Sequence, residues 1–175
     1  MNRPGGYTRR GRALAAAAAL LALGGCAVAP PFPPALTQQA HTVPAPDAVA
    51  RNARVPTAPV AWGGTIVSVV NQAHDTLITV LAFPLDSEMR PRLRATTIGR
   101  FIVRAKGFVE PLIYAPGREL SVIGRVTGIE GGTIGQLPYN YPVVAPQSMH
   151  LWPLQPLQTS PRFQFGIGIG VGTRF

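Results

Sequence analysis

The sequence contains few of the residue types that build disulfide frameworks, metal centres or active sites. Its 175 residues include one cysteine, three histidines and seven acidic residues. A lone cysteine excludes an intramolecular disulfide and any metal site made of several thiolates. The histidines, His41, His74 and His150, are far apart and match no metal-binding spacing such as H-x-x-E-H. These scarcities predict no metal site, no cofactor and no enzymatic activity.

Motifs of catalysis and nucleotide binding are also missing. No serine stands in a G-x-S-x-G context. The closest acidic pair, Asp86 and Glu88, is followed at once by Arg90, Arg92 and Arg94, so mutual ion pairing on a solvated loop is a simpler interpretation than acid–base catalysis. The glycines of "GIGIGVG" (166–172) lack the G-x-G-x-x-G spacing of a dinucleotide-binding turn.

The sequence has no long hydrophobic run. The longest uncharged apolar stretch, Ala13 to Leu23, is about half of the roughly 20 residues that a membrane-spanning helix needs. Four arginines precede it and Gly24 and Gly25 follow it, which is typical of a secretory signal peptide over residues 1–25. Removal of that peptide would leave twelve basic and seven acidic residues, a net charge of +5.

The cysteine itself follows this peptide directly. Leu23-Gly24-Gly25-Cys26 resembles the lipobox of bacterial lipoproteins, in which the cysteine is acylated and becomes the first residue of the mature chain. The resemblance implies that Cys26 carries the acyl chains that hold the protein on a membrane. Ala27 follows in place of the aspartate that marks inner-membrane retention, so the resemblance implies the outer membrane, with the protein facing the periplasm. The alternative is a buried or reactive free thiol.

Prolines dominate the next segment, residues 26–59. Eight of them restrict the backbone and remove hydrogen-bond donors, which predicts a semi-rigid linker with much polyproline II character. Such a linker would reach up to about 3.1 Å per residue. A short helix within Pro46 to Arg54 is the one interruption that the residues favour, because a cap-like aspartate precedes helix formers.

Residues 60–154 have the composition of short strands separated by turns. The sequence predicts strands at 60–70, 76–83, 98–105, 120–129 and 143–154, with the second strand apolar on both faces and a break over 130–142. Gly124 and Pro146 indicate bulges or tight bends. About 95 residues with five short strands predict an all-β fold, a small five-stranded OB-like barrel, whose closure removes exposed edges.

Several blocks of this region resemble a known family. The blocks "WGGTIVSVVN", "DTLITVLAFPLDSEMRP", "GRFIVRAKGFVEPLIYAPGRELSVIGRVTG" and "IGQLPYNYPVV", followed by "HLW", are similar to the Slp family of outer-membrane lipoproteins over about Ala61 to Trp152. The resemblance implies a non-enzymatic envelope lipoprotein, a binding or structural module induced by starvation or stress. It transfers no catalytic residue to this chain.

The last segment, residues 155–175, ends in a glycine-rich stretch of period two. In "FQFGIGIGVGTRF" (163–175), apolar side chains alternate mostly with glycine: Phe163, Phe165, Ile167, Ile169 and Val171. A lone strand leaves its backbone groups unpaired in lipid, so it would have to join other strands. The alternatives are a tail or extra strand on the barrel, and a strand that drives self-association; the oligomeric state stays open.

A cluster of cations is the remaining functional signal: Arg90, Arg92, Arg94, Arg100, Arg104 and Lys106. An OB-like barrel with a basic face ordinarily suggests nucleic acid. Export makes anionic envelope lipids the better partner, so we expect these six residues to contact such lipids and no nucleic acid to bind. An ordinary solvated surface is the alternative.

Overall fold

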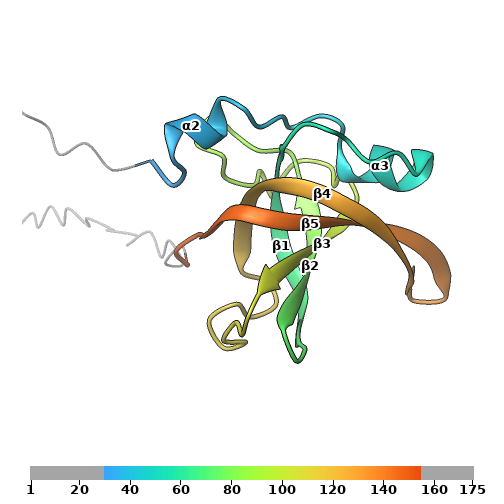
Figure 1. Ribbon diagram of the computed structural model, residues 1–175. Helices are drawn as coiled ribbons and strands as arrows, with labels where there is room; N and C mark the ends of the chain where they lie inside the picture. Colours follow the sequence, from blue (N-terminus) through green and yellow to red (C-terminus); the bar gives the residue numbers. More distant parts are fainter. Residues whose placement is uncertain (1–29, 155–175) are drawn as a thin grey trace, which may run out of the picture. The chain divides into compact units, whose positions relative to one another are not determined.

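The computed structural model describes residues 30–154. Several predictions therefore lie outside the described residues: the signal peptide over 1–25, the acylation of Cys26 and the strand at 163–175. Within the described residues, five strands form one closed barrel (Figure 1). Their bounds are β1 Val60–Asn71, β2 Asp75–Phe83, β3 Arg100–Lys106, β4 Glu119–Ile134 and β5 Leu137–Leu151.

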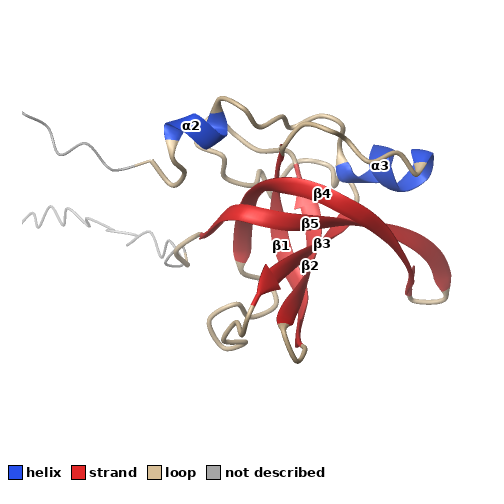
Figure 2. Cartoon of the chain, viewed as in Figure 1, coloured by secondary structure: helices blue, strands red, loops and turns tan. Residues whose placement is uncertain are grey.

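The strands are arranged in the order β1-β2-β3-β5-β4, and β4 returns to β1 to close the ring. All neighbours are antiparallel except β3 and β5, which meet in a short parallel contact at Ile102–Val143 and Val103–Val144. Figure 2 shows that strands make up most of the described fold. The predicted small all-β barrel is confirmed.

Alternating side chains fill the interior of the barrel. On β3, Phe101 and Val103 point inward and are fully buried. The Trp62 ring packs edge-on against the Phe101 ring with centroids 5.3 Å apart. β2 is apolar on both faces, as the sequence indicates, but only one face is fully buried, because its buried residues alternate with half-buried ones. The lumen is thus a packed core lined by one face of each strand.

The hairpin of β4 and β5 is longer than predicted. The expected break over 130–142 is wrong, because both strands continue through it and turn only at Gly135, where φ is +60°. Glycines weaken strands, but here the Tyr141 ring lies over Gly132, and the Tyr141 hydroxyl donates to the Thr133 carbonyl at 2.9 Å. This cross-strand packing supplies the contacts that glycine cannot make.

The bulge predicted at Gly124 is confirmed. The β4–β5 register shifts between Ile123 and Gly124, opposite Pro146. A Cβ at Gly124 would collide with the carbonyl of Ala145, so only glycine allows the two backbones to approach this closely.

The linker prediction is wrong for the described part of residues 26–59. This part contains the helices α2 (Pro34–Thr37) and α3 (Pro46–Asn52), and the chain from Pro31 onward belongs to the same compact unit as the strands. Phe32 is 2% exposed and Val49 is 1% exposed. The prolines do not prevent packing here, because each helix begins with one, where no hydrogen-bond donor is needed. The predicted short helix is confirmed as α3.

The two ends of the barrel are built differently, and we name them by β1. At the proximal end, where β1 begins, the Asp47 amide of α3 donates to the Ile98 carbonyl at 3.0 Å, and α3 contacts β5 and β3. At the distal end, where β1 finishes, Asn71 makes two hydrogen bonds to the backbone of Val109, in the loop that follows β3. Figure 1 shows α3 and the β1–β2 turn separated along the barrel.

Candidate functional site

The loop between β2 and β3, residues 84–99, holds three of the six predicted lipid-contacting cations and is ordered by its own hydrogen bonds. Leu85 and Pro91 form an isolated antiparallel bridge, and the Arg92 amide donates to the Pro84 carbonyl at 2.9 Å. The Asp86 carboxylate accepts from the backbone amides of Glu88 and Arg90, each at 2.9 Å. Asp86 thus closes a backbone turn within the loop.

Arg90 fastens this loop to the barrel. Its Nε and Nη2 donate to the two oxygens of Glu119 at 2.7 and 3.1 Å, and its guanidinium lies 5.2 Å from the centre of the Trp152 ring. The bond to the Glu119 carboxylate raises the pKa of Arg90 above its usual value. A bidentate, partly buried pair stacked on an aromatic ring has a fixed geometry. Arg90 therefore has a structural partner within the fold.

Two further bonds fasten the same loop at Met89. The Ser121 hydroxyl donates to the Met89 carbonyl at 2.6 Å and accepts from Trp152 Nε1 at 2.9 Å. Ser121 is one of two buried polar residues among the described residues, and both of its hydroxyl bonds are used here. The loop is held against β4 and the end of β5 as part of the fold.

Arg92 and Arg94 lie on the exposed part of the loop. The Ala95 amide donates to the Arg92 carbonyl at 2.8 Å, which closes a turn whose three leading side chains, Arg92, Leu93 and Arg94, are exposed. Within residues 30–154 neither guanidinium forms an ion pair. Leu93 is 43% exposed between them.

The three cations on β3 have different surroundings. Arg104 forms ion pairs with Asp75, at 3.3 Å, and with Glu130. Arg100 is half-buried, and its backbone amide donates to the Tyr139 hydroxyl at 2.9 Å. Lys106 is exposed at the end of β3, beside Asp75 at the distal end. The structure therefore keeps Arg92 and Arg94 together and distributes the other cations between ion pairs and the length of β3.

A second apolar cluster lies on the outer face of β1 and β4, apart from the barrel interior. Phe32, Ala61 and Ile123 are buried there, and the loop residues Leu85 and Met89 pack against them. The His150 ring meets Phe32 at 6.1 Å and Trp152 at 4.6 Å between centroids. The N-terminal arm (residues 30–41), the β2–β3 loop and the end of β5 thus meet at one place. Sequence reasoning missed this cluster; the one signal was an aromatic residue among prolines.

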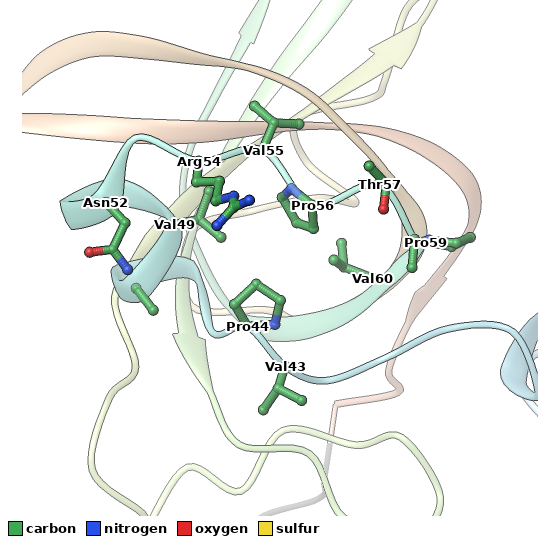
Figure 3. A pocket seen from close by; sticks show the side chains of 12 residues that line it. Val43, Pro44, Val49, Asn52, Arg54, Val55, Pro56, Thr57, Pro59 and Val60 are labelled. Carbon is green, nitrogen blue, oxygen red and sulfur yellow. The ribbon is translucent and has the colours of Figure 1, made fainter.

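A pocket of about 350 Å³ lies between α3, the segment that follows it and the start of β1. Figure 3 shows its mostly apolar lining, including Pro44, Val49, Val55 and Pro56, with Arg54 as its charged residue. The carbonyl of Pro44 accepts from Trp62 Nε1 at 3.1 Å, so the pocket wall is tied to the core. It offers contact to an apolar group and no acid–base pair.

Two of the three histidines lie on exposed segments of the described chain. His74 is exposed in the β1–β2 turn, and His41 is exposed on the arm, where its backbone pairs with Val60. Over residues 30–154, no three His, Cys, Asp or Glu side chains are grouped to hold a metal ion. The same described stretch contains no helix that is long and apolar enough to span a membrane.

A closed small β-barrel with an N-terminal arm packed on its outer face is the class of domain that these observations define. Residues 23–167 match the family described as "Outer membrane lipoprotein Slp family", and the chain belongs to that family. The match covers Cys26, the arm and the barrel.

Relatives in two organisms are similar to this chain over about half of its length. It is 33% identical over 94 residues to "Outer membrane protein Slp" and 34% identical over 93 residues to "Uncharacterized lipoprotein YeaY", both of Escherichia coli strain K12. It is 40% identical over 96 residues to an uncharacterized protein of Haemophilus influenzae. These matches cover 54%, 53% and 54% of this chain, and 50%, 48% and 52% of the relatives. The chain thus spans about half the length of the curated relatives it matches. No solved structure matches it.

Proposed function

We propose that this protein is anchored in the outer membrane through an acylated Cys26 and that its barrel is a non-enzymatic binding or structural module serving the envelope under starvation or stress. Membership of a family of outer-membrane lipoproteins supports the anchor, since the matched residues 23–167 include Cys26. In this proposal the barrel lies on the periplasmic side, and residues 1–25 are removed as a signal peptide.

The observation that carries the proposal is the burial of Phe32. Phe32 follows Cys26 by six positions and is 2% exposed on the outer face of the barrel. At about 3.5 Å per extended residue, those six steps along the chain reach at most about 20 Å. A linker extending to residue 59 would reach about 100 Å at 3.1 Å per residue. An anchor at Cys26 would therefore hold this domain at the membrane surface, as suits a module that works on the envelope itself.

The anchor is tested in cells by two neighbouring substitutions. Cys26→Ser should abolish incorporation of labelled palmitate and remove the protein from the outer-membrane fraction. Ala27→Asp should keep the label but move the protein to the inner membrane, because an aspartate after the cysteine marks retention there. Palmitate incorporation into the Cys26→Ser variant would refute the anchor; unchanged outer-membrane location of a labelled Ala27→Asp variant would refute the sorting assignment.

The stress role and the absence of catalysis need a separate test. We expect the protein to accumulate on entry into stationary phase, and a deletion strain to lose envelope integrity there, as scored by detergent sensitivity. Complementation by His74→Ala and His150→Ala variants should match wild type. Failure of His74→Ala, an exposed turn residue, with normal protein levels would favour a catalytic role.

The alternative function is self-assembly through the terminal strand. The alternating apolar residues 163–171 support it, because such a strand buries one face only when it joins others. Deletion of residues 163–175 should then lower the mass of the detergent-solubilised protein. An unchanged mass would remove this alternative.

A further inference from the structure

We propose that the turn Arg92–Leu93–Arg94 is a contact site for the anionic lipid headgroups of the membrane that holds the anchor, so that the proximal end of the barrel faces that membrane. This inference rests on the proposed acylation of Cys26. It goes further by assigning an orientation to the domain and by reducing six candidate cations to two.

The arm limits the orientation. Phe32 is fixed near the proximal end, since it packs on Ala61, the second residue of β1. The 12 residues of β1 extend over about 36 Å, which corresponds to a barrel on the order of 30 Å long once the strand tilt is included. The reach from Cys26 to Phe32 is only about 20 Å. The distal end therefore cannot rest on the anchoring membrane with the barrel upright.

The β2–β3 loop brings Arg92 and Arg94 to the same side of the molecule. Leu85 and Met89 of this loop pack against the cluster that contains Phe32. The Arg92 amide is bonded to the carbonyl of Pro84, the residue before Leu85. Figure 1 shows this loop close to α2, on the side where the arm runs. The turn is thus fixed to the surface from which the chain leads back to Cys26.

The side chains of the turn suit a headgroup layer. Two exposed guanidiniums flank Leu93, whose 43% exposure leaves an apolar side chain to enter the interfacial region. Guanidinium groups bind phosphate by charge-assisted hydrogen bonds. Arg90 and Arg104 are already paired with carboxylates, whereas Arg92 and Arg94 have no ion pair within the described part of the chain.

Acidic residues of the same loop lie at its other turn. Asp86 and Glu88 are exposed there, and the Asp86 carboxylate already accepts two backbone amides. They lower the net charge of the loop without occupying the turn at Arg92–Ala95. The proposal therefore assigns lipid contact to that turn and not to the loop as a whole.

The scarcity of cysteine makes it possible to label the protein at a single chosen position. Cys26 is the one cysteine of the chain, so in the acylated full-length protein an introduced cysteine is a unique reactive thiol. Leu93→Cys and the matched distal variant Leu112→Cys would each carry an environment-sensitive fluorophore. Leu93 is 43% exposed and Leu112 is 87% exposed, so neither substitution disturbs the core. Both proteins would be reconstituted in phosphatidylethanolamine–phosphatidylglycerol vesicles that contain a headgroup-labelled quencher.

We expect strong quenching at position 93 and little at position 112, and high salt or removal of phosphatidylglycerol should reduce the signal at 93. In the Leu93→Cys background, Arg92→Gln and Arg94→Gln should each lower the equilibrium constant for docking of the turn on the vesicle surface about fivefold. This is the loss expected when one cation is removed from an anionic surface. Lys106→Gln, which removes an exposed distal cation, should leave it unchanged. Equal or greater quenching at 112, or no quenching at 93, would overturn the orientation.

Mass spectrometry of the same samples separates this inference from the proposed function. A chain that carries acyl groups on Cys26 but shows no quenching at 93 would overturn the inference alone. A chain without acyl groups would overturn the anchor, and the inference with it.

Discussion

The proximal and distal ends of the barrel differ in how much of their apolar surface is covered by other segments of the chain. At the proximal end, segments that precede or interrupt the strands cover the apolar surface: the arm, α3 and the β2–β3 loop. At the distal end the loop after β3 leaves large apolar side chains in solvent, with Phe108 at 71% and Leu112 at 87% exposed. The strand pattern thus specifies the barrel, and short segments outside the strands decide which apolar surface is covered.

The distal loop is nevertheless held in place, by the packing of Val109 into the core and by polar bonds. Thr76 is fully buried, and its hydroxyl lies 2.8 Å from the Gly107 carbonyl and within hydrogen-bond distance of the Asn71 side chain. Asn71 in turn is bonded to Val109 through both its amide nitrogen and its carbonyl oxygen. The outer apolar cluster holds the segments at one end, and at the other end an asparagine–threonine pair adds polar bonds to the packing of Val109. The following substitutions test that contrast.

The largest effect should come from the arm. Phe32→Ala removes a buried aromatic side chain from the outer cluster and should lower the free energy of unfolding by about 3 kcal/mol, measured by chemical denaturation. Phe108→Ala is the matched control at the distal end and should cost less than about 0.5 kcal/mol, because its side chain is 71% exposed. Equal costs would show that the arm contributes no more than a surface loop.

A smaller loss is expected from the distal polar pair. Thr76→Val keeps the side-chain shape but leaves the Gly107 carbonyl and Asn71 without their hydroxyl partner, which should cost about 1–2 kcal/mol. Amide exchange should speed up in residues 107–114 and stay constant in the arm. The exposed Thr96→Val on the β2–β3 loop is the control and should change neither quantity. Faster exchange in the arm would mean that the two ends are coupled.

The ion pair of Arg90 should contribute less again. Glu119→Gln weakens the bidentate pair and should cost about 1 kcal/mol and make residues 84–99 more sensitive to limited proteolysis. Asp47→Asn, which breaks the exposed pair with Arg51 on α3, should cost about 0.3 kcal/mol.

This pair also has a defined pH dependence on its arginine side. The bond to Glu119 raises the pKa of Arg90 above its unfolded value, so the stabilisation is complete below that unfolded pKa and is lost only as the pH rises through the higher folded pKa. The cost of Glu119→Gln should therefore be the same at about pH 6 and about pH 9. A cost that disappears at the higher value would contradict this assignment.

The smallest effect on stability should come from the exposed distal side chains. Leu112→Ser together with Phe108→Ser should change the free energy of unfolding by less than about 0.5 kcal/mol but reduce binding of an apolar dye. Val55→Ser, at the 40% exposed wall of the pocket, is the proximal control. A larger loss of dye binding in the control would place the principal apolar surface at the proximal end.

The strands were predictable wherever alternation alone determines burial. On β3, Phe101 and Val103 are inward and Arg104 is outward, as the period of two requires. The extension of β4 and β5 through residues 130–142 was not predictable, because glycine and proline there are local breakers that Tyr141 overcomes only by packing across the hairpin. Local preference was overridden by a tertiary contact.

The partners of the charged residues at the candidate site could not be predicted from the sequence either. The cations were visible in the sequence, but their partners were not: Arg90 pairs with Glu119, which follows it by 29 positions, and Arg104 pairs with Glu130, 26 positions later. Only the fold shows which guanidiniums are already occupied. For the same reason, Phe32 gave no sign that it docks on Ile123, because the separation of these residues along the chain hides the contact.

The docking of Phe32 also imposes an order on biogenesis. The arm leaves the ribosome first, yet Ile123, part of the surface that receives it, is synthesised far later, so the arm is among the last segments able to find its place. If the chain is exported as proposed, Cys26 would be presented before the arm has docked. Enzymes that acylate it would act before the barrel closes over its own beginning, and completion of the fold would then draw the finished domain down to the bilayer.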